Sequence, residues 1–190
     1  MSERIQYAEL LTPLLTPVAD IFDVESLINN DFDGVVQNLP AGWKLAKAAQ
    51  GRAILTNPDL LVPELGIKGL ALKVFPFETH ARALVQAYKD IKPFVKPDEF
   101  PLLYPTGYVR NAVVFPFVHG IVSASEDTTG LDQMWKILED AGIDPFETAL
   151  DLAGKLSRFE LDDGTHVFTD PFEDTLMSLS DAADKYGFTQ

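Results

Sequence analysis

Four prolines recur at a spacing of four within one segment, residues 93–108. Proline lacks a backbone N–H and is excluded from helix interiors and central strands, so this segment is predicted to be extended or to form turns. Four aromatic residues are interleaved with the prolines: Phe94, Phe100, Tyr104 and Tyr108. They either fill the chain's own core or anchor a protein partner, because aromatic residues are enriched in cores and in interface centres. We take partner binding as the hypothesis for these four residues.

The remaining segments mix helical and strand patterns. Apolar residues at helical spacing predict helices over 78–91 and 129–142, and strand-forming residues predict strands over 67–75 and 111–122. Gly69 within the first of these strands suggests a bulge or a close approach of another backbone. Further helices are expected over 23–29, 42–55, 144–156 and 170–187.

Two shorter features complete the pattern. Pro13 and Pro17 follow a helix-like start and are expected to break it into a packed arm or turns. Alternating apolar residues on both sides of Asp163-Gly164 predict a β-hairpin over 157–169.

Three tetrapeptides beginning Pro-Phe-Glu start at residues 76, 145 and 171. The second and third follow an aspartate and fit the capping pattern of a helix start, with proline at the first helical position. Phe75 precedes the first copy in place of an aspartate, so that helix is expected to begin two or three residues later, with Glu78 or Thr79 as the cap.

These patterns together predict an α+β protein without regular strand–helix alternation. We expect a mostly helical single domain over residues 1–190, with a small antiparallel sheet that includes the hairpin 157–169 between two capped helices. A subdivision into a lobe of residues 1–125 and a lobe of residues 126–190 is also possible. The charge supports the subdivision, because the first lobe carries 13 acids and 11 bases and the second carries 16 acids and 4 bases.

The net charges are therefore −2 and −12, and they restrict the class of partner. An acidic surface repels nucleic-acid backbones and favours a basic protein or a cation. The absence of cysteine excludes disulfides and thiol chemistry. Residues 1–7 lack the pattern of a signal peptide, and the longest uncharged stretch, 111–125, is too short to span a membrane, so a cytoplasmic or virion location is expected.

Few residues match a known catalytic or binding motif. Residues 29–34 resemble the first half of an EF-hand loop, but Pro40 stands where the bidentate carboxylate should be, so no metal is expected. His80, His119 and His166 lie about forty residues apart, without metal-ligand spacing. Ser123 beside His119 lacks the surroundings of a serine nucleophile, and neither phosphate-binding glycine motif occurs.

We therefore expect no catalytic residue, cofactor or metal, and a non-catalytic structural or protein-interaction subunit of an oligomer or larger complex. A virus or phage particle, or its assembly factor, is one such setting. Two alternatives remain open. The chain is an acidic inhibitor that imitates DNA, or it is an enzyme or small-molecule binder whose pocket is assembled from distant residues.

Overall fold

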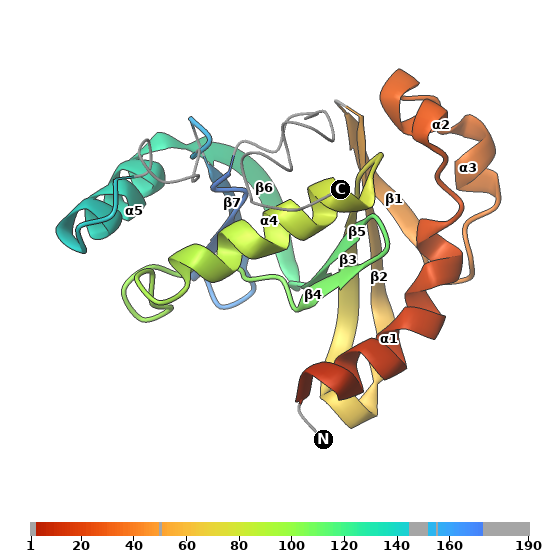
Figure 1. Ribbon diagram of the computed structural model, residues 1–190, viewed down its shortest axis with the longest axis horizontal. Coiled ribbons are helices and arrows are strands. Elements are labelled where there is room, and N and C mark those ends of the chain that lie inside the picture. Colours follow the sequence, from red (N-terminus) through yellow and green to blue (C-terminus); the bar gives the residue numbers. More distant parts are fainter. Residues whose placement is uncertain (1–2, 50, 145–151, 155, 173–190) are drawn as a thin grey trace. The chain divides into compact units, whose positions relative to one another are not determined.

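The computed structural model describes residues 3–49, 51–144, 152–154 and 156–172, with the backbone alone for 3–8, 49 and 120–127 (Figure 1). The helices are α1 (Glu3–Ala19), α2 (Val24–Asn29), α3 (Asp33–Gln37), the 3-10 turn η1 (Pro63–Leu65), α4 (Glu78–Ile91) and α5 (Thr128–Asp140). The strands are β1 (Lys44–Ala49), β2 (Arg52–Val62), β3 (Ile67–Val74), β4 (Gly107–Val109), β5 (Ala112–Pro116), β6 (Gly120–Asp127), β7 (Leu156–Leu161) and β8 (His166–Thr169). No helix among the described residues is long and apolar enough to cross a membrane.

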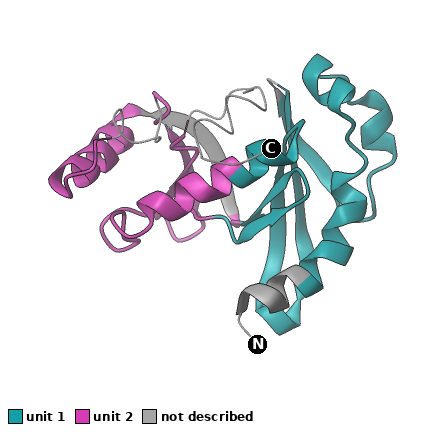
Figure 2. Cartoon of the chain, viewed as in Figure 1, with its two compact units in different colours: residues 1–82, 105–117 teal, residues 83–104, 118–190 magenta. Residues whose placement is uncertain are grey.

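The chain divides into two compact units, coloured separately in Figure 2. Unit 1 comprises residues 1–82 and 105–117, and unit 2 comprises residues 83–104 and 118–190. Both units are discontinuous in sequence, because residues 83–104 belong to unit 2 while the strands on either side of them belong to unit 1.

Unit 1 is built on a five-stranded antiparallel sheet in the order β1-β2-β3-β5-β4. Helices α1, α2 and α3 lie on one side of this sheet (Figure 1). Their buried side chains form one hydrophobic core with the facing residues of the strands, including Leu15, Leu27, Leu55, Leu72 and Val114. Burial of this apolar surface is the main free-energy source that holds the helices on the sheet.

Helix α1 corrects the expectation that two prolines break the first segment. It runs continuously from Glu3 to Ala19 with Pro13 and Pro17 inside it. Both prolines are exposed, whereas Leu11 and Leu15 are buried. The carbonyls that lose their helical partners lie on the solvent side, where water satisfies them, and the buried stripe supplies the compensating free energy.

Residues 42–55 also differ from the prediction, because they form strands β1 and β2 and not a helix. Gly51 lies in the turn between the strands with φ of +73°, a conformation that glycine adopts without strain. Ala53 and Leu55 alternate into the core with a period of two. Pairing with neighbouring strands therefore overrides the helical propensity of an alanine- and lysine-rich segment.

The unusual feature expected at Gly69 is confirmed. The pairing of β2 with β3 shifts register between Asn57 and Leu61, and Pro58 lies in this irregularity. A Cβ atom on Gly69 would come within 2.9 Å of the Pro58 carbonyl oxygen and 2.8 Å of the Phe117 Cβ. The bulge explains how a proline is tolerated inside an eleven-residue strand.

Unit 2 contains the antiparallel sheet β6-β7-β8 and helix α5. The hairpin predicted over 157–169 is confirmed, with Ser157 paired to Thr169 and Gly164 in the turn at φ of +79°. Helix α5 confirms the helix predicted over 129–142, and Gly142 follows its end at φ of +77°. Most residues of the helices expected over 144–156 and 170–187 lie outside the described residues. The parts that are described are not helical, because Leu152 forms an isolated β-bridge with Phe172 and Leu156 begins strand β7.

The expected fold class is wrong in its balance of elements. The structure contains a five-stranded and a three-stranded antiparallel sheet and is not mostly helical. The error arose because the residues 42–55 that complete the larger sheet carry helix-forming side chains. The helix after the first Pro-Phe-Glu copy begins at Glu78, two residues after Pro76, as expected. Glu78 and Thr79 are its first helical residues, so neither is the cap that the sequence suggested.

Candidate functional site

Strand β3 carries a buried lysine in the middle of unit 1. The side chain of Lys73 is only 6% exposed. Its neighbours Leu72 and Val74 belong to the core under α1–α3, so Lys73 lies on the opposite face of the sheet, because successive strand residues alternate between faces. Its Nζ atom lies 5.9 Å from the centre of the Phe75 ring.

The surroundings of Lys73 on this face are apolar. Ile54 on β2 and Val113 on β5 are its direct cross-strand partners. Ala71, two residues earlier on the same face, pairs with Phe115 of β5. Cross-strand partners share one face of a sheet, so Lys73 lies between Ile54 and Val113 in a row that continues to Lys47 on β1 and Tyr108 on β4.

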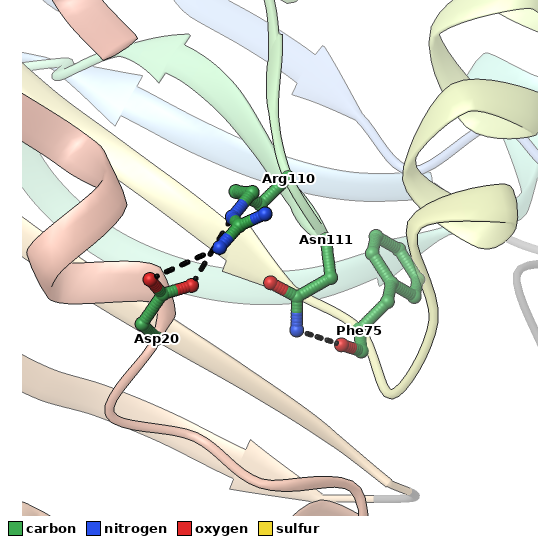
Figure 3. A network of polar contacts seen from close by, with 4 residues as sticks. All are labelled: Asp20, Phe75, Arg110 and Asn111. Carbon is green, nitrogen blue, oxygen red and sulfur yellow. Dashed lines mark hydrogen bonds and ion pairs between the residues drawn. The ribbon is translucent and has the colours of Figure 1, made fainter. Parts of the chain in front are cut away.

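A polar network fixes the end of β3 next to this lysine (Figure 3). The Asn111 side-chain amide donates to the Phe75 carbonyl at 2.6 Å, and the Phe75 N–H donates to the Asn111 carbonyl at 2.8 Å. The neighbouring Arg110 guanidinium donates two hydrogen bonds of 3.3 Å to the Asp20 carboxylate at the end of α1. The β4–β5 turn thus ties α1 to the strand that carries Lys73.

We expect Asn111→Ala to lower the free energy of unfolding by about 1–3 kcal/mol, because the Phe75 carbonyl loses its side-chain donor. Arg110→Gly provides the matched control in the same turn. It removes an exposed ion pair worth at most about 1 kcal/mol and relieves a non-glycine residue at φ of +56°. Urea unfolding checks both values, and equal losses would contradict the role assigned to Asn111.

The proline–aromatic segment is divided between the two units. Tyr108 lies half-buried in strand β4 of unit 1. Phe94, Phe100 and Tyr104 belong to unit 2, where Phe100 is 1% exposed and stacks on Phe168 at 4.9 Å. A partner could reach Phe100 only if the Phe100 side chain left this position, whereas Phe94 and Tyr104 are only partly buried.

Tyr104 closes the loop that follows α4. Its hydroxyl donates to the Val95 carbonyl, and its ring meets Tyr88 edge-on at 5.9 Å and lies 5.6 Å from the Lys92 ammonium. Burial raises the pKa of Tyr104 to about 12, because it disfavours the charged phenolate. The phenol therefore stays protonated as a hydrogen-bond donor at ordinary pH.

A second cluster in unit 2 surrounds the end of β8. The Tyr88 hydroxyl lies 3.2 Å from the Thr169 hydroxyl and accepts the Asp170 N–H at 3.3 Å. Phe172 is buried and meets the Tyr88 ring edge-on at 5.1 Å. Asp170 has a φ of +60°, which is uncommon for a residue with a side chain. This turn is therefore held by side-chain contacts from α4.

The other sequence candidates are scattered. Residues 29–34 are split between the end of α2, the left-handed cap Asn30 and the start of α3. His80 lies in unit 1 against Phe75 and Phe77, whereas His119 and His166 are exposed residues of unit 2. Searches of the described residues find no group of three metal-ligating side chains. The side chain of Ser123 lies outside the described residues.

Sequence reasoning missed Lys73, although a signal was present. The tetrapeptide Leu70-Ala71-Leu72-Lys73 ends the strand predicted over 67–75 with a charge among apolar residues. Of the acidic C-terminal third that suggested a DNA mimic, the structure describes helix α5 and the β7–β8 hairpin, and most residues of the two further helices expected there lie outside the described residues. Comparisons find no matching family model, curated protein or solved structure, so the residues themselves carry the functional inference.

Proposed function

We propose that this chain is a kinase-like protein that binds a nucleoside triphosphate through Lys73 and does not transfer its phosphoryl group. The observation that carries the proposal is the buried lysine on the third strand of an antiparallel sheet, with a helix directly after that strand. In protein kinases the phosphate-binding lysine stands on the third strand in the motif V-A-I-K, and helix αC follows. The equivalent motif here is L-A-L-K, ending at Lys73, and the helix is α4. The support is an analogy of architecture and residue type.

The burial of Lys73 favours an anion as its ligand. Bringing an ammonium group to 6% exposure costs desolvation free energy, which methionine of similar length would avoid. A phosphate group offsets this cost because it pairs with the charge at the same depth.

The same face of unit 1 offers a surface for the base. Ala71 has a small side chain and is partly exposed, and its cross-strand partners Thr56 and Phe115 flank it. Flat heterocycles bind between apolar walls, with a few polar groups that fix their orientation. The base would lie over Ala71, and the phosphates would lie two residues further along β3, at Lys73.

Several parts needed for phosphoryl transfer are missing from the sequence. It contains no G-x-G-x-x-G, no H-R-D and no D-F-G. Kinases pair the strand lysine with a glutamate of helix αC. The carboxylates of α4 are Glu78 and Asp90, in its exposed first and last turns, and none occupies a buried position. The proposal is therefore limited to nucleotide binding, and the non-catalytic role stays a prediction.

Titration calorimetry with ATP and Mg²⁺ tests the proposal. We expect wild-type protein to bind in the micromolar to submillimolar range and Lys73→Met to bind at least about tenfold more weakly, since a hydrogen bond to a charged group contributes about 1.5–3 kcal/mol. Lys68→Met is the matched control, because Lys68 lies exposed on the same strand. Lys73→Arg is the second test variant, for use if Lys73→Met folds poorly. It keeps the positive charge and should therefore retain part of the affinity for ATP.

Two results would contradict the proposal. The proposed nucleotide site would be contradicted if wild-type protein bound no ATP at millimolar concentration. It would also be contradicted if Lys68→Met and Lys73→Met weakened ATP binding equally. Transfer of labelled phosphate from ATP to the protein or to a general protein substrate would instead refute the non-catalytic part. A protein that binds without reacting acts through its partners, so the interaction role expected from the sequence remains part of the proposal.

A further inference from the structure

Three of the residues that surround Ile54 in the sheet of unit 1 are cationic. Ile54 on β2 has Lys47 of β1 and Lys73 of β3 as its direct cross-strand partners. Arg52 precedes Ile54 by two residues on β2 and therefore lies on the same face of the sheet. We call Lys47, Arg52 and Lys73 the basic cluster. Its three members share the sheet face opposite α1–α3.

Sheet geometry holds the members of the basic cluster at short intervals. Arg52 is the diagonal neighbour of both lysines, an arrangement that places residues about 7–8 Å apart. The two lysines are separated by two strand spacings, or about 10 Å. Lys47 is exposed and Arg52 is partly buried. Long side chains at these intervals can converge on one multivalent anion.

The Lys73 side chain extends along β3 in the direction of Arg52. Its Nζ atom lies 5.9 Å from the centre of the Phe75 ring. Val74 pairs with Ala53, and continuing this antiparallel register by one residue places Phe75 opposite Arg52. The Lys73 ammonium therefore lies on the side of its row that faces Arg52.

The charge of unit 1 is divided between the two sides of its sheet. Residues 5–43, which form the helical layer, contain six acids and no lysine or arginine. Strands β1–β3 contain a single carboxylate, that of Asp59. Their basic residues alternate with core residues and so face away from the helices; they are Lys44, Lys47, Arg52, Lys68 and Lys73. This face therefore attracts anions, although the whole chain has a net charge of −14.

We infer that Arg52 and Lys47 hold the β- and γ-phosphates of the nucleotide bound at Lys73, so that the site selects nucleoside triphosphates over monophosphates. The inference rests on the proposed function, in which the base lies over Ala71 and the first phosphate reaches Lys73. The direction from Ala71 to Lys73 continues to the row of Arg52, so a longer phosphate chain meets the other two cations. Charge-assisted hydrogen bonds to phosphate are strong, and a monophosphate is too short to make all of them.

Titration calorimetry with ATP and with AMP, both with Mg²⁺ and about 0.15 M KCl to screen distant charges, tests the inference. We expect Lys47→Glu to weaken ATP binding at least about tenfold and AMP binding less than about twofold, because a like charge is placed only where the longer chain ends. Arg52→Met is expected to show the same selectivity. Glutamate keeps a charge on the edge strand β1, so protection of that edge against aggregation is retained.

Lys44→Glu is the matched control. Lys44 is exposed on the same strand and the same face, but it lies opposite Thr56 and outside the basic cluster. Its reversal should change the affinity for either nucleotide less than about twofold.

The outcomes separate this inference from the proposed function. Selective loss of ATP affinity in Lys47→Glu and Arg52→Met, with normal affinity in the control, supports the inference. Equal weakening of ATP and AMP binding by Lys47→Glu, or equal effects of Lys47→Glu and Lys44→Glu, would overturn it and leave nucleotide binding through Lys73 intact. Displacement of ATP by an equal concentration of a glutamate hexapeptide would overturn it in favour of general attraction of acidic ligands. Wild-type protein that binds no ATP would contradict the proposed function and the inference with it.

Discussion

Phe100→Ala is expected to lower the free energy of unfolding of unit 2 by about 3–5 kcal/mol, the usual cost of deleting a fully buried phenylalanine. The side chain is 1% exposed and its ring stacks on Phe168 at an interplanar angle of 20°. The loop is further tied to β8 by two backbone hydrogen bonds, from Leu103 to the Phe168 carbonyl at 2.7 Å and from Phe168 to the Pro101 carbonyl at 2.8 Å. Truncation therefore leaves a cavity beneath a loop that cannot readily collapse.

Chemical denaturation followed by circular dichroism measures this loss. Phe94→Ala is the control on the same segment, because Phe94 is only half-buried and should cost less than half as much. The pair also tests the partner-binding hypothesis for these aromatics. A Phe100→Ala protein with wild-type stability that fails to assemble with a partner would favour the interface interpretation and contradict the stability prediction.

Gly69→Ala is expected to cost about 2–5 kcal/mol in unit 1. Gly69 has a φ of +77°, where an alanine is strained by about 1–2 kcal/mol. The new Cβ would also stand 2.8 Å from the Phe117 Cβ and 2.9 Å from the Pro58 carbonyl oxygen, distances that force the strands to shift. Overpacking of this kind adds about 1–3 kcal/mol.

Gly66→Ala separates the two contributions. Gly66 has a similar φ of +64°, but a Cβ there would meet nothing within 4 Å. It should therefore show only the backbone strain of about 1–2 kcal/mol. Thermal unfolding of the two variants side by side provides the measurement, and equal shifts in Tm would show that close packing at the β2 bulge contributes little.

Local pattern predicted several elements correctly. The apolar spacing of residues 78–91 predicted helix α4, and the turn residues Asp163-Gly164 predicted the β7–β8 hairpin. Gly69 predicted the close approach of another backbone, which is that of Pro58. These features depend on side chains that are close in sequence or on a backbone conformation that one residue type favours. The two clear errors, at residues 1–19 and 42–55, involve propensities that packing overrode.

The candidate site lay beyond local pattern for a related reason. Lys73 appears in the sequence as one of 15 basic residues, and its apolar neighbours along the strand do not by themselves establish that it is buried. Its depth depends on strand partners from β2 and β5, the latter about forty residues away.

The sequence alone determined that residues 93–108 cannot form a helix or a central strand, because proline removes a backbone donor wherever it stands. Only the tertiary structure decided what the aromatics in that segment do. Phe100 is enclosed in unit 2 against Phe168, while Tyr108 joins the sheet of unit 1 as part of its edge strand β4. Whether a side chain is enclosed depends on residues far away in the chain that pack against it, and that pairing is settled by the free energy of the whole fold.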